Sequence, residues 1–176
     1  MSLLASTALI LVLAPPASVA KGTFSFVKKS SNIDAHFTVA DAFAWEQPSQ
    51  DDPETKVIRV WLSEKPLDHT ALVSAADLRA ELFRQSGKER LLELEFGGDG
   101  TWLNTAWKLP ATMCGLCGED EAYRKASSVK VGNGTVRASL KVNPSDYTDS
   151  LSAPAIDLTL DIKVERRLTT AAAPPF

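Results

Sequence analysis

The feature that most constrains the fold is a strict alternation of apolar and polar residues near the C-terminus. In the segment 156–164 every second residue is aliphatic, namely Ile156, Leu158, Leu160, Ile162 and Val164. Because successive side chains of a strand point to opposite faces, this segment predicts a β-strand with one buried and one hydrated face. The segment 136–142 alternates in the same way. It follows the pair Asn133-Gly134, which accepts positive φ angles and so predicts a tight hairpin turn.

Period-two patterns account for most of the remaining chain. The segment 56–63 has apolar residues on both faces, which indicates a central strand, and further strands are expected at 22–28, 33–45 (bent), 91–96 and 101–109. One helix is expected at about 74–86, because Ser74 and Asp77 resemble a capping box and Gly87 stands where a C-terminal cap would. About eight strands and one inserted helix predict a mainly β fold, a single antiparallel sandwich or barrel.

The N-terminal segment carries an export signal by composition. It has no charged side chain, an apolar run from Leu3 to Leu13 that is too short to span a bilayer, and small residues Ser18 and Ala20 before Lys21. An apolar anchor is the alternative, because no basic residue precedes the run. We therefore expect an exported protein, periplasmic or extracellular, without stable membrane insertion after cleavage. Its expected parts are a signal peptide (1–20), a globular domain (21–168) and a flexible Ala/Pro tail (169–176).

The charge balance argues against a nucleic acid partner. The chain has 19 basic and 22 acidic residues and a net charge of −3, whereas proteins that hold a phosphate backbone present a basic field. The partner is instead expected to be another protein, a small molecule or a glycan.

A phrase in the middle of the chain resembles a known group of proteins. The phrase Val60-Trp-Leu-Ser-Glu-Lys-Pro-Leu-Asp68 follows an Ala/aromatic stretch, Asp41-Ala-Phe-Ala-Trp45. This order is similar to that in a loose group of uncharacterised exported bacterial β-rich proteins, over about half of the mature chain. The resemblance implies export and a β-rich fold, and no activity. The cysteine-containing segment departs from the pattern of that group.

The most compact candidate site is the Cys-x-x-Cys pair of Cys114 and Cys117. A structural disulfide is the first interpretation, because exported proteins meet oxidants. A thiol–disulfide redox site is the alternative, since the residues after Gly118 could form a short helix that lowers a thiol pKa. Three consecutive acidic residues, 119–121, oppose that effect. Metal binding is the third interpretation, although only two histidines, His36 and His69, could add nitrogen ligands, and neither has paired spacing.

Aromatic residues near the cysteines suggest a recognition surface. Trp102, Trp107 and Met113 could line an apolar or glycan-binding face, and packing in the core is the alternative for the two tryptophans. No motif points to catalytic residues, a metal or a cofactor, so enzymatic activity is not favoured. The sequence therefore predicts an exported, non-catalytic binding or interaction domain, with an exported thiol–disulfide redox protein as the alternative.

Overall fold

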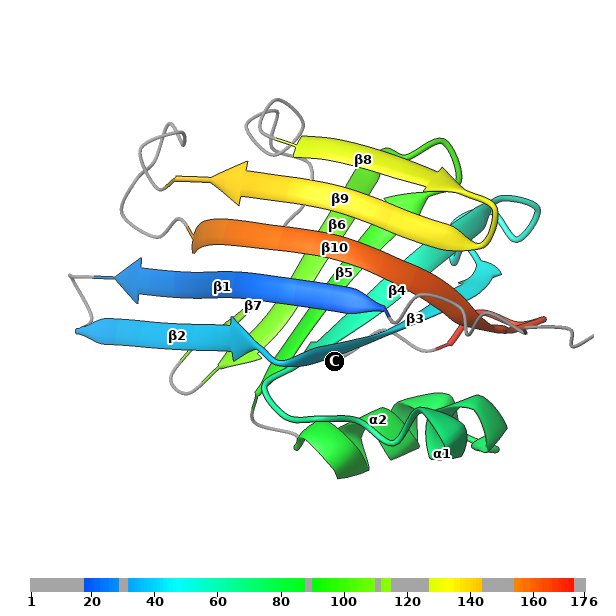
Figure 1. Ribbon diagram of the computed structural model, residues 1–176, viewed down its shortest axis with the longest axis horizontal. Coiled ribbons are helices and arrows are strands. Elements are labelled where there is room, and N and C mark those ends of the chain that lie inside the picture. Colours follow the sequence, from blue (N-terminus) through cyan, green and yellow to red (C-terminus); the bar gives the residue numbers. More distant parts are fainter. Residues whose placement is uncertain are drawn as a thin grey trace, which may run out of the picture.

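The computed structural model describes residues 18–28, 32–87, 90–109, 112–114, 127–143 and 154–172. Within these ranges ten strands and two helices follow one another along the chain (Figure 1). The strands are β1 (Val19–Lys28), β2 (Ile33–Val39), β3 (Asp41–Pro48), β4 (Lys56–Ser63), β5 (Leu91–Gly97), β6 (Trp102–Leu109), β7 (Thr112–Cys114), β8 (Ser127–Gly132), β9 (Thr135–Val142) and β10 (Pro154–Arg167). The helices are α1 (His69–Ser74) and α2 (Leu78–Ser86). The expected mainly β fold with little helix is confirmed.

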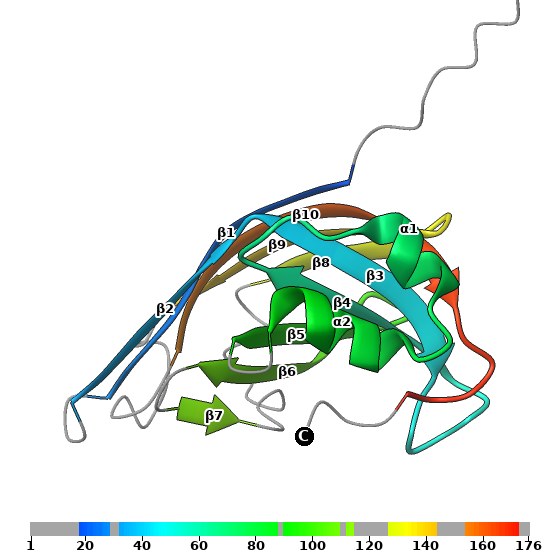
Figure 2. The ribbon, with the colours of Figure 1, turned by 90° about the horizontal axis from the view of Figure 1, so that it is seen from below.

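All described strands belong to one sheet that curls on itself, and β10 joins its two halves. Most of β10 pairs antiparallel with β1 and β9, and its last residues pair parallel with β3. The first half-sheet therefore has the order β2-β1-β10-β9-β8, and the second has the order β10-β3-β4-β5-β6-β7. Figures 1 and 2 show the two half-sheets facing each other, with both helices on the far side of the second.

The main hydrophobic core fills the space between the half-sheets. Phe24 and Phe37 from the first half-sheet meet Val60 and Leu94 from the second, and none of them is more than 1% exposed. Burying a side chain of this size contributes roughly 1.5–3 kcal/mol, so this inter-sheet cluster is a large source of stability. The expected alternation of β9 and β10 is confirmed, because the aliphatic residues from Val136 to Val142 and from Ile156 to Ile162 face this core.

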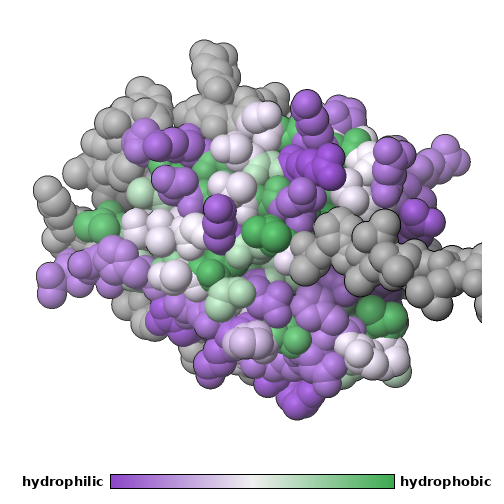
Figure 3. All heavy atoms as spheres, in the orientation of Figure 1, coloured by the Kyte–Doolittle hydropathy of each residue, from purple (hydrophilic) through white to green (hydrophobic). Residues whose placement is uncertain are grey.

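The opposite face of the first half-sheet is hydrated. It presents hydroxyl-bearing residues on neighbouring strands, together with cross-strand ion pairs such as Arg137–Asp161. Figure 3 looks onto this face and shows polar and neutral side chains with isolated apolar ones between them. The hydroxyl-bearing residues are Thr23, Ser25, Thr38, Ser139 and Thr159.

Both helices cover the outer face of the second half-sheet. Leu72 of α1 and Leu78 and Leu82 of α2 pack on Phe43 and Trp61 in a second, smaller apolar cluster. The prediction of a single helix at 74–86 is therefore wrong in its first turn, because α2 begins at Leu78 and Ser74 ends α1. Two short helices are present, because Asp68 and Asp77 each cap a helix by accepting a hydrogen bond from a backbone N–H three residues later. Gly87 ends α2 as expected.

Three details of the strands refine the sequence expectations. The bent strand at 33–45 divides into β2 and β3, which turn at Ala40 and join different half-sheets. The β10–β3 pair is parallel, so the expectation of a wholly antiparallel sheet is corrected. The hairpin between β8 and β9 is confirmed, with φ of 52° at Asn133 and 69° at Gly134.

Candidate ligand pocket

The outer face of the second half-sheet carries charged side chains beneath α2. Arg59 on β4 and Glu93 and Glu95 on β5 alternate with aliphatic residues that face the core. The strand register places Arg59 opposite Glu95, and Trp61 opposite Glu93. Helix α2 adds Arg79 from above. Three separate elements therefore bring two arginines and two glutamates together.

These four residues form a buried ion-pair network. Arg59 Nη1 lies 2.9 Å from Glu93 Oε1, and its Nη2 lies 2.8 Å from Glu95 Oε2. Arg79 Nη1 lies 3.0 Å from Glu93 Oε2. The side chains of Arg59 and Glu93 are only 6% and 3% exposed. The Glu93 carboxylate accepts hydrogen bonds from Arg59 of β4 and Arg79 of α2, so it links the helix to the sheet.

Two tryptophans complete the surroundings of Arg79. Its Cζ lies 5.9 Å from the ring centroid of Trp45 and 6.0 Å from that of Trp61, which is within cation–π range. The indole N–H of Trp45 donates to Gln47 Oε1 at 2.7 Å, and that of Trp61 donates to Ser86 Oγ at 3.0 Å. Both rings are thus held in orientation.

Three nitrogen atoms in this layer are buried without a hydrogen-bond partner in the described part of the chain. They are Nε2 of Gln47, Nε of Arg59 and Nε of Arg79. An unmade bond at a buried donor costs about 1–3 kcal/mol, and such a donor can be satisfied by water or by a ligand. Of the three residues, only Arg79 also lines the cavity next to the network.

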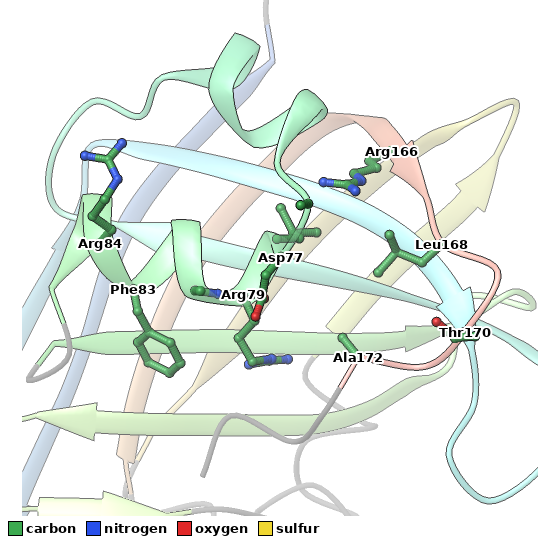
Figure 4. Close-up of a pocket in the computed structure, with 11 residues that line it drawn as sticks. Asp77, Arg79, Phe83, Arg84, Arg166, Leu168, Thr170 and Ala172 are labelled. Atoms are coloured by element: carbon green, nitrogen blue, oxygen red, sulfur yellow. Dashed lines mark hydrogen bonds between the residues drawn. The ribbon is translucent and has the colours of Figure 1, made fainter.

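That cavity lies between α2 and the segment that follows β10, and its volume is about 820 Å³. Figure 4 shows α2 on one side of it and Leu168, Thr170 and Ala172 on the other. The segment is tied to β3, because Leu168 N–H donates to Glu46 O and Ala172 N–H donates to Gln47 Oε1. The cavity is therefore lined in part by a stretch that the sequence predicts to be a flexible tail.

Glu95 is the most accessible carboxylate of the network. Burial raises the pKa of Glu95 above its usual range, Arg59 opposes this rise, and the negative charge of Glu93 adds to it. Its side chain is 16% exposed. We therefore expect Glu95, at the margin of the network, to take up a proton at a higher pH than an ordinary glutamate does.

A second polar site ties α1 to both neighbouring strands. His69 Nδ1 lies 2.7 Å from Glu165 Oε1, and its Nε2 lies 3.2 Å from both oxygens of Asp41. Burial alone would lower the pKa of His69. The hydrogen bonds and negative charges of the two carboxylates outweigh it, so the pKa is raised above the ordinary 6.5. A protonated imidazole can donate from both nitrogens at once, whereas the neutral ring can donate from only one.

This geometry gives His69 a pH-dependent contribution to stability. The raised pKa means that the contribution is complete below about pH 6.5 and is lost as the pH rises through the folded-state pKa. We expect His69→Gln to lower the urea midpoint more at pH 5.5 than at pH 8.5. His36→Gln is the matched control, because His36 is 68% exposed and pairs with Asp34 on edge strand β2. An equal loss at both pH values for His69→Gln would contradict the assignment.

The structure corrects the expected aromatic surface. Trp102 and Trp107 are each 3% exposed and belong to the inter-sheet core. The ring of Trp107 lies 5.1 Å from that of Phe24 and 5.9 Å from that of Phe26. Trp107 pairs with inward-facing Leu92. A shift of the β5–β6 register between Glu95 and Phe96 pairs Trp102 with inward-facing Phe96, so both rings face the core although they are five residues apart. They do not form an exposed binding face.

The cysteine pair falls largely outside the described residues. Cys114 ends β7, and its backbone pairs with that of Trp107, while Met113 pairs with Lys108. Cys117 lies in the range 115–126, which the structure does not describe. The disulfide and redox interpretations of Cys114 and Cys117 therefore stay predictions.

Comparisons with known proteins do not assign the chain to a family. No protein-family model matches it, and neither the curated proteins nor the solved structures include a significant match. In the described ranges, no helix is long and apolar enough to cross a membrane. The same ranges contain no group of three or more His, Cys, Asp or Glu residues arranged to hold a metal ion.

Sequence reasoning did not find the ion-pair network. Arg59, Glu93 and Glu95 look like the hydrated face of ordinary strands. One signal was present, because the 56–63 segment carries large apolar residues on both faces, which implies that neither face is open to water. A charged residue in such a strand needs a buried partner, and Arg59 could have been recognised on that ground.

Proposed function

We propose that this chain is an exported, non-catalytic binding domain whose ligand site is the cavity between α2 and the segment after β10. The observation that carries the proposal is the cavity itself, about 820 Å³ in volume and lined by both apolar and charged side chains. Cavities of this size and mixed lining are typical of sites for small organic molecules. The apolar N-terminal segment supports export, with a mature chain that begins at Lys21.

Contacts within the protein hold both walls of the cavity, which supports a binding site that is already formed before the ligand arrives. Arg79 is held by Glu93 beneath α2, and Leu168 and Ala172 are held by β3 on the opposite side. A site that is ordered before the ligand arrives loses less conformational entropy on binding. The ion-pair network beneath α2 therefore keeps one wall of the cavity in place before a ligand binds.

The pairing of the charged groups around the cavity favours binding over catalysis. Arg79 is engaged by Glu93, and Arg84 is engaged by Glu81. The Asp77 carboxylate accepts a hydrogen bond from Ala80 N–H as the cap of α2. These contacts give all three groups structural roles, which fits a binding site better than a catalytic one.

The proposal is tested on the full chain after export from a bacterial host. The intact mass of the exported protein should correspond to a start at Lys21. The uncharged fluorophore N-phenyl-1-naphthylamine should bind the purified protein. Ala80→Trp should weaken that binding at least about tenfold, because Ala80 lines the cavity and an indole there would occupy it. Ala171→Trp is the control, since Ala171 is an exposed alanine that does not line the cavity.

Two results would count against the proposal. Absence of probe binding to the exported protein would remove the cavity as a binding site. Equal binding by the wild-type, Ala80→Trp and Ala171→Trp proteins would place the probe elsewhere on the molecule.

A further inference from the structure

Basic side chains outnumber acidic ones in the cavity lining. Among the described residues, three arginines contribute to the lining (Arg79, Arg84 and Arg166), and one carboxylate does, that of Asp77. Two of the three guanidinium groups are neutralised by glutamates outside the lining, Arg79 by Glu93 and Arg84 by Glu81.

Arg166 differs from the other two arginines. Its Nη1 donates to the backbone carbonyl of Leu72 at 2.9 Å, and no carboxylate of the described chain forms an ion pair with it. The neighbouring Glu165 is engaged by His69 instead. The Leu72 carbonyl is a hydrogen-bond partner for Arg166 but carries no net charge. The positive charge of Arg166 at the cavity is therefore not neutralised by it.

A bulge in β10 places Arg166 on the cavity side. The pairing of β10 with β3 shifts between Val164 and Arg166, so that Val164 faces Ala44 and Arg166 faces Trp45. Val164 packs against the inter-sheet core, and Trp45 lies on the outer face. Without the extra residue, alternation from Val164 would turn Arg166 toward the core. The bulge therefore places the guanidinium of Arg166 on the outer face of the second half-sheet.

The rest of the lining is largely apolar. Leu78 and Phe83 of α2 and Leu168 opposite them contribute hydrophobic surface, together with three alanines. Figure 4 shows Arg166 and Leu168 near the N-terminal end of α2, and Phe83 further along the helix. The cavity thus offers a cationic group near one end and apolar surface along its length.

We infer that the ligand is an amphipathic organic anion, with a carboxylate or similar acidic group at Arg166 and an apolar body against Leu168, Leu78 and Phe83. The planar guanidinium can donate two parallel hydrogen bonds to such a group. This inference rests on the proposed function and specifies the chemistry of its ligand.

The experiment compares two probes of similar shape and different charge. The anionic probe is 1-anilinonaphthalene-8-sulfonate, and the uncharged probe is N-phenyl-1-naphthylamine. We expect Arg166→Gln to raise the Kd of the anionic probe about tenfold or more and to leave that of the uncharged probe nearly unchanged. Decanoate should displace the anionic probe. Arg167→Gln is the matched control, because the neighbouring Arg167 is 72% exposed and does not line the cavity.

A second pair of variants keeps the test valid if Arg166→Gln impairs folding. Thr170 is exposed and lines the cavity. Thr170→Glu adds a negative charge there, and Thr170→Gln adds a similar volume without charge. We expect the Kd of the anionic probe to be at least about threefold higher for Thr170→Glu than for Thr170→Gln, with no such difference for the uncharged probe.

The outcomes separate this inference from the proposed function. If Ala80→Trp blocks the uncharged probe but neither Arg166→Gln nor Thr170→Glu affects the anionic one, the cavity binds ligands without a preference for anions. The inference then fails and the proposed function stands. If the wild-type protein binds neither probe, both fail.

Discussion

Replacing Glu93 by alanine should lower the free energy of unfolding by about 3–5 kcal/mol. The carboxylate accepts hydrogen bonds from both Arg59 and Arg79, and its side chain is 3% exposed. Its removal leaves the guanidinium of Arg79 buried without a carboxylate and leaves Arg59 with only one. Burial of an unpaired charge is among the most destabilising changes a single substitution can make. Urea unfolding at pH 7 measures the loss.

Glu95→Ala is the matched control for this prediction. Glu95 lies on the same face of β5, is more exposed, and forms an ion pair with Arg59 alone. Glu95→Ala should lower the free energy of unfolding by less than half as much as Glu93→Ala does. A loss for Glu93→Ala no larger than that for Glu95→Ala would mean that the network does not hold α2 on the sheet. The double variant Glu93→Ala/Arg79→Ala should be only slightly less stable than Glu93→Ala alone, since the two residues form one interaction.

Gly22→Ala should produce the other large loss, on the order of 3 kcal/mol or more. Gly22 lies within β1 at φ of +130°, a conformation that L side chains rarely adopt and whose strain costs about 1–3 kcal/mol. A Cβ atom there would lie 2.0 Å from the carbonyl oxygen of Asp157 and 2.9 Å from the Cα of Leu158. Both are backbone atoms of β10, so relief requires the two paired strands to separate.

Gly87→Ala separates the clash from the backbone strain. Gly87 has φ of +88°, and a Cβ atom there would meet no atom within 4 Å. Gly87→Ala should therefore lower the free energy of unfolding only by the backbone strain of about 1–3 kcal/mol. Thermal and urea unfolding of both variants gives the comparison. A smaller loss for Gly22→Ala than for Gly87→Ala would show that β1 adjusts at this position without cost.

Local sequence patterns predicted the strands well and the helices less well. The alternation in β9 and β10 depends only on neighbouring residues, so it identified the buried faces of both strands. The helix boundaries were harder to predict because Ser74, Asp68 and Asp77 are all acceptable caps. Backbone hydrogen bonds from Ala71 and Ala80 to the two aspartates determine which residues begin a helix.

The candidate site was the least predictable part of the molecule. Trp102 and Trp107 are candidates for a surface by residue type, and the pairing of β6 with β5 turns them into the core. The cavity instead combines α2 with the segment after β10, which are some 80 residues apart in the sequence. No local pattern reports such a distant pairing.

The mainly β chain, the β8–β9 hairpin and the inward faces of the long strands could be predicted without coordinates, because they follow from side-chain alternation and the φ preferences of single residues. Two features depend on long-range pairing: β10 joins two half-sheets, and a bulge beside Glu165 turns Arg166 outward. The same holds for the buried network that Arg59, Glu93 and Arg79 share. These features depend on which strands pair and in what register, and the free energy of that choice comes from contacts between residues far apart in the chain.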